Sequence, residues 1–351
     1  MSLALLKAIA MKFDIAFIGF GNVGRGLAEL LLEKKDELRV NHGVEFRIVA
    51  ISDIMAGSIL DDRGIDLREA LRLGDSKTNL ETMSAQKKGL SALDAIKGSS
   101  ANTVVEVTWT NITDGEPGYS HMKTALSMGK HVVTSNKGPI ALHYPELKKL
   151  AASKNAKLKF KGTVLSGTPA HNLFDGALAG CSVSAIRGIV NGTTNYILTQ
   201  MESGCDYADA LKEAQRLGYA EANPAMDVEG GDAAAKITIL ANVLLGGKLK
   251  PDMVDRKGIT SVTREEILRA KERGERIKLL ARASKKGSAV QAEVSRVPVP
   301  VTDPLANIAG VTNAITFDTD CLGSVTIVGP GAGRRATGYA LLTDLISIAN
   351  Q

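Results

Sequence analysis

The hydrophobic pattern of the chain changes partway along it. Up to residue 155, short apolar runs typical of buried strands alternate with segments whose apolar residues recur at helical spacing. We expect strands at residues 12–19, 46–52, 103–108 and 131–134, and helices at residues 22–35, 119–128 and 145–154. Strands that alternate with helices predict an α/β fold with a doubly wound parallel sheet of the Rossmann type. Sheets of this kind bind ligands at the carboxyl ends of their strands.

From residue 156 onward strands and helices no longer alternate. We expect strands at residues 157–165, 185–190, 289–299 and 324–328, and helices at residues 196–201, 206–217, 231–245, 264–282 and 337–348. Residues 61–90 are polar and poorly periodic, which indicates an insertion that decorates the first domain. Because 351 residues are more than one compact core usually takes, we predict two domains, the second of α+β type.

Composition and charge narrow the classes of function. The net charge is only +5, and no block of basic residues with interleaved aromatics is present, so we expect no nucleic-acid partner. No apolar run reaches membrane length, so we expect no membrane span. Cys181, Cys205 and Cys321 lack zinc-like spacing. We expect each to be a small core residue in a protein of the reducing cytoplasm, without disulfides.

A glycine-rich turn joins the first expected strand to the first expected helix. Its sequence is Gly19-Phe20-Gly21-Asn22-Val23-Gly24, a GxGxxG pattern. The first glycine allows a tight turn, the second lets a pyrophosphate approach the backbone, and the third lets helix and strand pack closely. The free N–H groups of the helix N-terminus favour the same anion. We therefore predict that this turn binds a dinucleotide.

Asp53 ends the second expected strand and is the candidate for binding the adenosine ribose. A carboxylate there would favour NAD over NADP, because it would repel a 2′-phosphate. Asp53 follows Gly24 at a longer spacing than usual, which we attribute to a long first helix and a polar loop over residues 39–45. Arg63 follows in the next loop, so both cofactors stay open, as does a simple turn role for Asp53.

Two polar segments follow strands at points where a ligand could bind. Thr134-Ser135-Asn136-Lys137 comes after the strand at residues 131–134, and we expect Lys137 to lie in a loop near the cofactor. The segment 191–195, Asn-Gly-Thr-Thr-Asn, precedes a helix. Taken alone, the segment 191–195 is explained better by helix capping than by a ligand pocket. The alternative for Lys137 is a solvated loop lysine.

The segment 218–236 carries the densest polar chemistry of the chain. Asp232 and Lys236 are four residues apart and therefore share one face of a helix that is apolar nearly all round. Ionisable groups on a buried helix are costly unless they are paired or in use. With Glu221 and Asp227 they would form an acidic pocket containing one lysine. Acidic groups suit a ligand ammonium, and a desolvated lysine can exchange protons near neutral pH.

These segments together resemble homoserine dehydrogenase. The resemblance rests on GYAEANPAMDVEGGDAAAK at residues 218–236 and on Asn-Gly-Thr-Thr-Asn at residues 191–195, and it covers nearly the whole chain. The family implies a reversible NAD(P)-dependent interconversion of L-homoserine and L-aspartate 4-semialdehyde, in the biosynthesis of threonine and methionine.

The resemblance also implies roles for single residues. Lys236 would be the general acid/base, Asp232 would orient it and the substrate, and Lys137 would be a second catalytic lysine. Glu221 and Asp227 would hold the substrate ammonium. The other implied contacts are Thr193 and Gly192 with the substrate, and Thr108, Lys137, Gly218, Gly331 and Gly333 with the cofactor.

On this basis we predict a dinucleotide-binding domain over residues 11–155, with a helix at 330–351 packing back onto it. A catalytic and dimerisation domain would span residues 156–329, and residues 1–10 would be an extension. The family implies a homodimer. It often has a glutamate of a monovalent-cation site where this chain has Lys161, so we expect no metal.

Two alternatives remain open from the sequence. One is another Rossmann-fold semialdehyde or amino-acid dehydrogenase. Aspartate-semialdehyde dehydrogenase would require a nucleophilic cysteine, and the neighbours of the three cysteines do not mark one. The other is a non-catalytic NAD(H)-binding sensor, which would need no buried Asp232–Lys236 pair.

Overall fold

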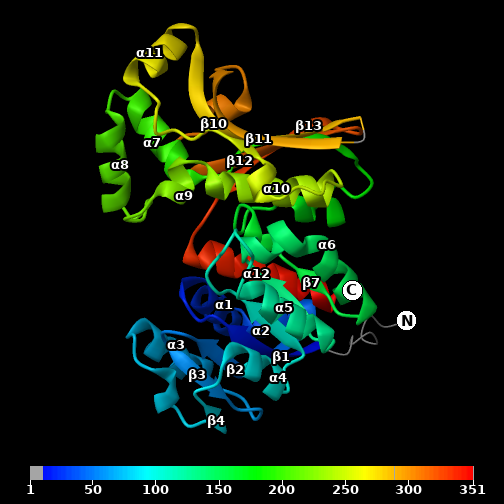
Figure 1. The fold of residues 1–351 in the computed structure, drawn as a ribbon. Coiled ribbons are helices and arrows are strands. Elements are labelled where there is room, and N and C mark those ends of the chain that lie inside the picture. The colour runs from blue at the N-terminus through cyan, green and yellow to red at the C-terminus, as the bar shows by residue number, and fades with distance from the viewer. Residues whose placement is uncertain (1–10, 288, 351) are drawn as a thin grey trace. The chain divides into compact units, whose positions relative to one another are not determined.

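The computed structural model describes residues 11–287 and 289–350 and divides the chain into two compact units (Figure 1). The first unit contains the residues up to Thr163 together with those from Gly333 onward. The second unit is Val164–Ala332. The expected extension at residues 1–10 lies outside the described residues. Within the described part of the chain, no helix is both long and apolar enough to cross a membrane.

The first unit is built on a seven-stranded sheet with strand order β4-β3-β2-β1-β5-β6-β7. Its strands are β1 (Met11–Ile18), β2 (Val44–Asp53), β3 (Gly57–Leu60), β4 (Lys87–Lys88), β5 (Thr103–Glu106), β6 (His131–Thr134) and β7 (Leu158–Lys159). Strands β2, β1, β5, β6 and β7 pair in parallel, whereas β3 and β4 pair antiparallel at one edge. This arrangement confirms the predicted Rossmann-type fold.

The first unit also contains seven helices among the described residues. They are α1 (Asn22–Glu33), α2 (Lys35–His42), α3 (Leu67–Asp75), α4 (Ala92–Gly98), α5 (Gly118–Ser127), α6 (Lys137–Ser153) and α12 (Arg334–Ala349), with short 3₁₀ turns η1 (Leu80–Thr82) and η2 (Lys161–Thr163). The apolar residues of β1, β2, α1 and α12 share one core, which includes Phe13, Ile51, Leu27 and Leu345.

Glycines allow α12, the last helix of the chain, to pack closely on α1 (red and blue in Figure 1). A Cβ atom added to Gly26 would lie 2.2 Å from the backbone oxygen of Arg334. One added to Gly338 would lie 2.4 Å from the backbone carbonyl carbon of Gly26. Arg335 adds an ion pair with Glu33 at 2.7 Å. The two helices therefore meet backbone to backbone, and any side chain at these glycines would separate them.

The second unit contains a six-stranded sheet with strand order β13-β12-β8-β10-β11-β9. Its strands are β8 (Val183–Ile189), β9 (Asp255–Arg256), β10 (Glu275–Lys286), β11 (Ala289–Pro300), β12 (Thr312–Thr319) and β13 (Gly323–Pro330). Only the β9–β11 pair among them is parallel. Helices α7 (Gly192–Glu202) and α10 (Gly231–Leu244) pack on this sheet. The remaining helical segments are η3 (His171–Asp175), α8 (Tyr207–Arg216), α9 (Ala225–Val228), η4 (Pro251–Met253), α11 (Arg264–Glu272) and η5 (Pro304–Asn307).

Four local predictions were wrong. The helix expected at 264–282 ends at Glu272, because Gly274 adopts a left-handed φ of +71° and the chain then enters β10, a central strand buried on both faces. The strand expected at 157–165 shortens to β7, since Lys161 begins a 3₁₀ turn. Residues 61–90 were expected to decorate the first domain as a poorly periodic insertion, but they are part of its fold, because β4 lengthens the sheet and α3 packs on α1 and adds to the core. The polar loop expected at 39–45 is mostly helix α2.

Candidate active site

The glycine turn after β1 has the backbone geometry that a pyrophosphate site needs. Gly19 adopts a left-handed φ of +93°, and a Cβ there would lie 2.6 Å from the oxygen of Val107. A Cβ on Gly24 would lie 2.8 Å from the oxygen of Gly19, so the third glycine allows strand and helix to touch. Gly21 has no neighbouring atom within 4 Å of its Cβ position and provides no side chain to cap α1. The helix N-terminus therefore presents its N–H groups to open space, which fits an anionic cofactor group.

Asp53, at the end of β2, lies directly beside this turn. Its Oδ2 accepts a hydrogen bond from the backbone N–H of Phe20 at 2.7 Å. Its Oδ1 accepts bonds from Met55 and Ala56 at 2.8 and 2.9 Å. The carboxylate is thus held in place by the backbone, at the point where the sequence predicted a ribose ligand, and it also stabilises the turn.

A buried carboxylate that the sequence analysis missed organises the next strand end. Glu106 is fully buried at the end of β5. Its Oε1 accepts hydrogen bonds from the Thr108 backbone N–H at 3.3 Å and from the Thr108 hydroxyl, and it lies 3.5 Å from His121 Nδ1. Its Oε2 accepts from the Thr134 hydroxyl at 3.3 Å. A glutamate inside the apolar run Thr-Val-Val-Glu-Val was the sequence signal for this role.

Lys137 is not in a loop, as the sequence suggested, but is the first residue of α6. The cap of that helix is Asn136, whose Oδ1 accepts a hydrogen bond from the Gly138 N–H at 3.3 Å. The Asn136 amide nitrogen donates to the Trp109 oxygen at 3.2 Å and to the Thr108 hydroxyl oxygen at 3.4 Å. One side chain therefore fixes the spacing between Thr108 and the start of α6. The segment therefore follows β6 at the carboxyl end of the strand, as expected, and it also caps a helix, which was not expected.

In the second unit, Lys236 is buried on α10 with only 8% of its surface exposed. Its ammonium donates to the backbone oxygen of Val190, just past β8, at 2.6 Å and to Asp232 Oδ2 at 2.7 Å. The predicted pair on one helix face is therefore present and shielded from water. A buried charge held by one carbonyl and one carboxylate keeps a third N–H available for a ligand.

Asn191 joins this pair to a second carboxylate. Its amide nitrogen donates to Asp227 Oδ1 at 2.7 Å and to Asp232 Oδ2 at 2.9 Å. Its Oδ1 accepts from the Thr194 N–H at 2.9 Å and caps α7. Burial, and to a lesser degree the charge of Asp232, raises the pKa of the Asp227 carboxyl, although the Asn191 bond opposes this. We call Asn191, Asp227, Asp232 and Lys236 the lysine–carboxylate group.

Three other residues were expected in the substrate pocket, and they differ in burial and in position. Thr193 is buried, and its hydroxyl donates to the Tyr219 oxygen at 2.5 Å, which brings the 191–195 and 218–236 segments together. Gly192 precedes it at the start of α7, where a Cβ would lie 2.8 Å from the Val311 oxygen. Glu221 is exposed, and its backbone oxygen accepts a hydrogen bond from the Gln215 side chain. The structure does not bring the Glu221 carboxylate into the lysine–carboxylate group.

The three glycines expected at the cofactor occupy different surroundings. Gly218, after α8, adopts a φ of +75° and faces open space. A Cβ on Gly331 would lie 2.3 Å from the Asn313 amide in the second unit. Gly333 is the cap residue of α12 in the first unit, with a φ of +132°. All three positions require glycine for backbone or packing reasons.

Lys161 occupies a dry position in the first unit. Its ammonium donates to the Thr343 hydroxyl at 3.0 Å and lies 5.0 Å from the centre of the Tyr339 ring. Its backbone N–H donates to Asp344 Oδ2 at 2.9 Å. Burial lowers the pKa of the Lys161 ammonium, and the charge of Asp344 opposes that shift. This lysine therefore joins the η2 turn to α12.

Comparison with known proteins identifies the family. A family model described as "Homoserine dehydrogenase" matches residues 169–346, and one described as "Homoserine dehydrogenase, NAD binding domain" matches residues 19–161. The chain is 42% identical to an NAD(+)-dependent homoserine dehydrogenase of Pseudomonas canavaninivorans, over 96% of each protein.

Solved structures agree with this assignment. A putative homoserine dehydrogenase from Archaeoglobus fulgidus superposes with a TM-score of 0.86 at 38% identity, over 96% of this chain and 99% of that one. A hyperthermophilic archaeal homoserine dehydrogenase in complex with NADPH gives 0.81 at 34% identity, over 96% and 97%. These matches decide against the aspartate-semialdehyde dehydrogenase alternative. The chain belongs to the homoserine dehydrogenases, NAD(P)-dependent oxidoreductases that act on a CH–OH group.

Proposed function

We propose that Lys236 is the general acid/base of the interconversion of L-homoserine and L-aspartate 4-semialdehyde. The observation that carries this proposal is the burial of its ammonium between the Val190 carbonyl and the Asp232 carboxylate. A lysine with this surrounding can give up and regain a proton without moving, because both partners hold Nζ in place. Asp232 is the residue that orients it.

When bound, the nicotinamide ring supplies a hydride to the aldehyde carbon or takes one from the alcohol carbon. In the reductive direction, Lys236 gives its proton to the oxygen on which negative charge develops, directly or through one water. Lys137 stabilises the same charge electrostatically. In the oxidative direction, the neutral Lys236 amine takes the hydroxyl proton as the hydride leaves.

The acidic residues and the α7 N-terminus would bind the rest of the substrate. Asp227 and Glu221 are suited to the substrate ammonium, and Thr193 and Gly192 to the pocket wall. The pKa of Asp227 is raised because burial disfavours its ionised form, and a ligand cation beside it would favour that form again. Binding of the ammonium and ionisation of Asp227 would therefore favour each other.

The glycine turn would hold the cofactor pyrophosphate, through Gly19, Gly21, Asn22, Val23 and Gly24. Asp53 would bind the adenosine ribose and favour NAD, because its fixed carboxylate would repel a 2′-phosphate. Thr108 and Lys137 would contact the nicotinamide half, and the remaining cofactor contacts would be Gly218, Gly331 and Gly333.

We further propose that the first unit is the dinucleotide-binding domain and that the second is the catalytic and dimerisation domain. The protein would act as a homodimer in the cytoplasm, where its three free cysteines would stay reduced. No nucleic-acid or membrane partner is proposed.

The test is absorbance at 340 nm with L-homoserine and either NAD or NADP. A rise that Lys236→Ala abolishes, while nucleotide binding is kept, supports the proposal. A faster rise with NAD supports the role of Asp53. Full activity of Lys236→Ala would refute the assignment of the acid/base, and nucleotide binding without any rise would favour the sensor alternative.

A further inference from the structure

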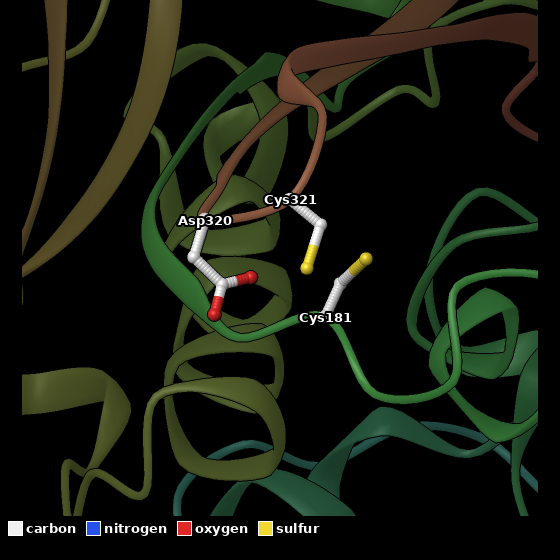
Figure 2. Close-up of side chains that lie close together, drawn as sticks. All are labelled: Cys181, Asp320 and Cys321. Atoms are coloured by element: carbon white, nitrogen blue, oxygen red, sulfur yellow. The ribbon is translucent and has the colours of Figure 1, made fainter.

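Two of the three cysteines, Cys181 and Cys321, lie close together in space. Their neighbours Ser182 and Asp320 are 138 positions apart along the chain but are joined by a hydrogen bond. Cys181 precedes β8, and Asp320 and Cys321 form the turn between β12 and β13. Figure 2 shows both sulfur atoms between these two segments, with the Asp320 carboxylate beside them. The two sulfurs and a carboxylate oxygen all lie within 4.8 Å of one another. The expectation that all three cysteines are core residues was wrong, because Cys205 and Cys321 are exposed and Cys181 is half-buried.

The backbone places these three side chains together. Thr319 pairs with Val183 in the β8–β12 ladder, so Cys321, two residues on, lies opposite Cys181, two residues back. The Asp320 N–H donates to the Ser182 oxygen at 3.1 Å, and the Ser182 N–H donates to Asp320 Oδ1 at 2.8 Å. These reciprocal bonds extend the ladder beyond the last strand pair and fix one oxygen of the carboxylate.

The turn itself is also fixed. The Thr319 hydroxyl donates to the Gly323 oxygen at 2.9 Å and accepts from the Leu322 N–H at 3.1 Å. Cys321 therefore sits in a turn closed by its own neighbours, facing a strand end that is bonded to the same turn. The sulfurs and the carboxylate are held close together before any ligand binds.

We propose that Cys181, Asp320 and Cys321 bind a thiophilic divalent cation such as Zn²⁺. The cation would be held by two thiolates and one carboxylate oxygen, with water in the fourth tetrahedral position. Sulfur and carboxylate ligands in a four-coordinate arrangement are typical of zinc. Binding forms two metal–sulfur bonds and releases the two thiol protons to solvent, so no oxidant or reductant is needed.

This site is remote from the proposed chemistry. Cys181 precedes β8, whereas Val190, which contacts Lys236, follows it. Nine residues of extended chain span about 30 Å. The cation would therefore connect the β12–β13 turn to the start of β8, and it would stabilise the second unit without taking part in the reaction. The inference is independent of the proposed function.

The test is a titration of the reduced, metal-free full-length protein with Cd²⁺ and Zn²⁺. We expect a cadmium–thiolate charge-transfer band that saturates at one ion per chain, and a melting temperature that rises with added Zn²⁺. Cys181→Ser and Cys321→Ser should each weaken Zn²⁺ binding by at least about 100-fold, since even outer-shell changes cost 10–100-fold. Asp320→Asn, which can still accept the Ser182 bond, should weaken it less.

Cys205→Ser is the matched control, because it removes an exposed cysteine of the same unit that lies outside the site. It should leave the band and the melting shift unchanged. Because these positions are exposed or half-buried, the metal-free melting temperatures should show that all variants fold. Absence of the band, or equal Zn²⁺ binding by Cys181→Ser and wild type, would overturn the proposal. So would a reduced protein that binds no metal but forms a Cys181–Cys321 disulfide on mild oxidation.

Discussion

Replacing Lys236 by methionine tests the central assignment most directly, because it keeps the apolar stem and removes only the ammonium. The variant loses the hydrogen bonds to the Val190 oxygen at 2.6 Å and to Asp232 Oδ2 at 2.7 Å. Loss of a well-placed acid/base group lowers the rate by about 10²–10⁴-fold, which corresponds to about 3–5 kcal/mol of transition-state stabilisation.

The same change should cost stability. Asp232 keeps its bond from Asn191 at 2.9 Å but loses its cation in a site where its side chain is only 15% exposed. Leaving a largely buried carboxylate without this partner costs about 1–3 kcal/mol. A fall in turnover alone would therefore not separate a catalytic role from partial unfolding.

Lys278→Met is the control that separates them. Lys278 is a fully buried lysine of the same unit, with its ammonium 3.0 Å from the Ile308 oxygen and 3.3 Å from Glu202 Oε1. It has the same kinds of partner but lies outside the lysine–carboxylate group. We expect Lys278→Met to lower the melting temperature and to keep the turnover number of the folded fraction.

The assay is steady-state NAD(P)H formation at 340 nm, with nucleotide binding measured by fluorescence and folding by thermal melting. Lys236→Met should bind nucleotide normally and turn over at least about 100-fold more slowly. If folded Lys236→Met keeps turnover within about tenfold of wild type, or if folded Lys278→Met loses as much, the reasoning fails.

Three further changes have defined outcomes. Asp227 has a raised pKa in the folded state, so its carboxyl contributes stability below the unfolded pKa, and this contribution is lost as pH rises through the folded pKa. Asp227→Asn should therefore gain stability relative to wild type as pH rises from about 4 toward neutral, as measured by thermal melts at several pH values. The KM for homoserine should rise in the same variant. A stability difference that does not depend on pH would contradict this reasoning. Glu106→Gln places an amide NH₂ where the Thr108 and Thr134 hydroxyls both donate. It should lower the free energy of unfolding, measured by chemical denaturation, by about 1–3 kcal/mol and raise the KM for nucleotide. Unchanged values would show that the network is dispensable. Gly24→Ala puts a Cβ 2.8 Å from the Gly19 oxygen. It should destabilise the protein by about 1–3 kcal/mol and weaken nucleotide binding, which a titration measures. Wild-type affinity would argue against the close approach of strand and helix.

Features that depend on neighbours in sequence were predicted well. The strand, glycine turn and helix at Gly19–Gly24 follow from local patterns, and so does the pairing of Asp232 with Lys236, one turn apart on a buried helix. The alternation of strands and helices in the first unit was likewise predicted from the local hydrophobic pattern.

Contacts between distant segments were not predicted. Asn191 is 36 and 41 residues from the two carboxylates it joins, so nothing local marked its amide as more than a cap. The cysteines were assigned to the core because they are few and lack metal-like spacing. Their approach was not predicted, since β12 was not expected and without β12 no register places Cys321 opposite Cys181. The role of Glu106 likewise depends on β6 lying beside β5.

The close packing of α12 on α1 has a consequence for how the chain folds as it leaves the ribosome. Leu341, Leu342 and Leu345 of α12 complete the apolar core that begins with Phe13 and Phe17 of β1. All of Val164–Ala332 must be translated before that helix emerges. The first unit to be synthesised is therefore the last to be completed, and during translation its exposed apolar surface is a natural binding site for chaperones, whereas the second unit can fold from a continuous stretch of chain.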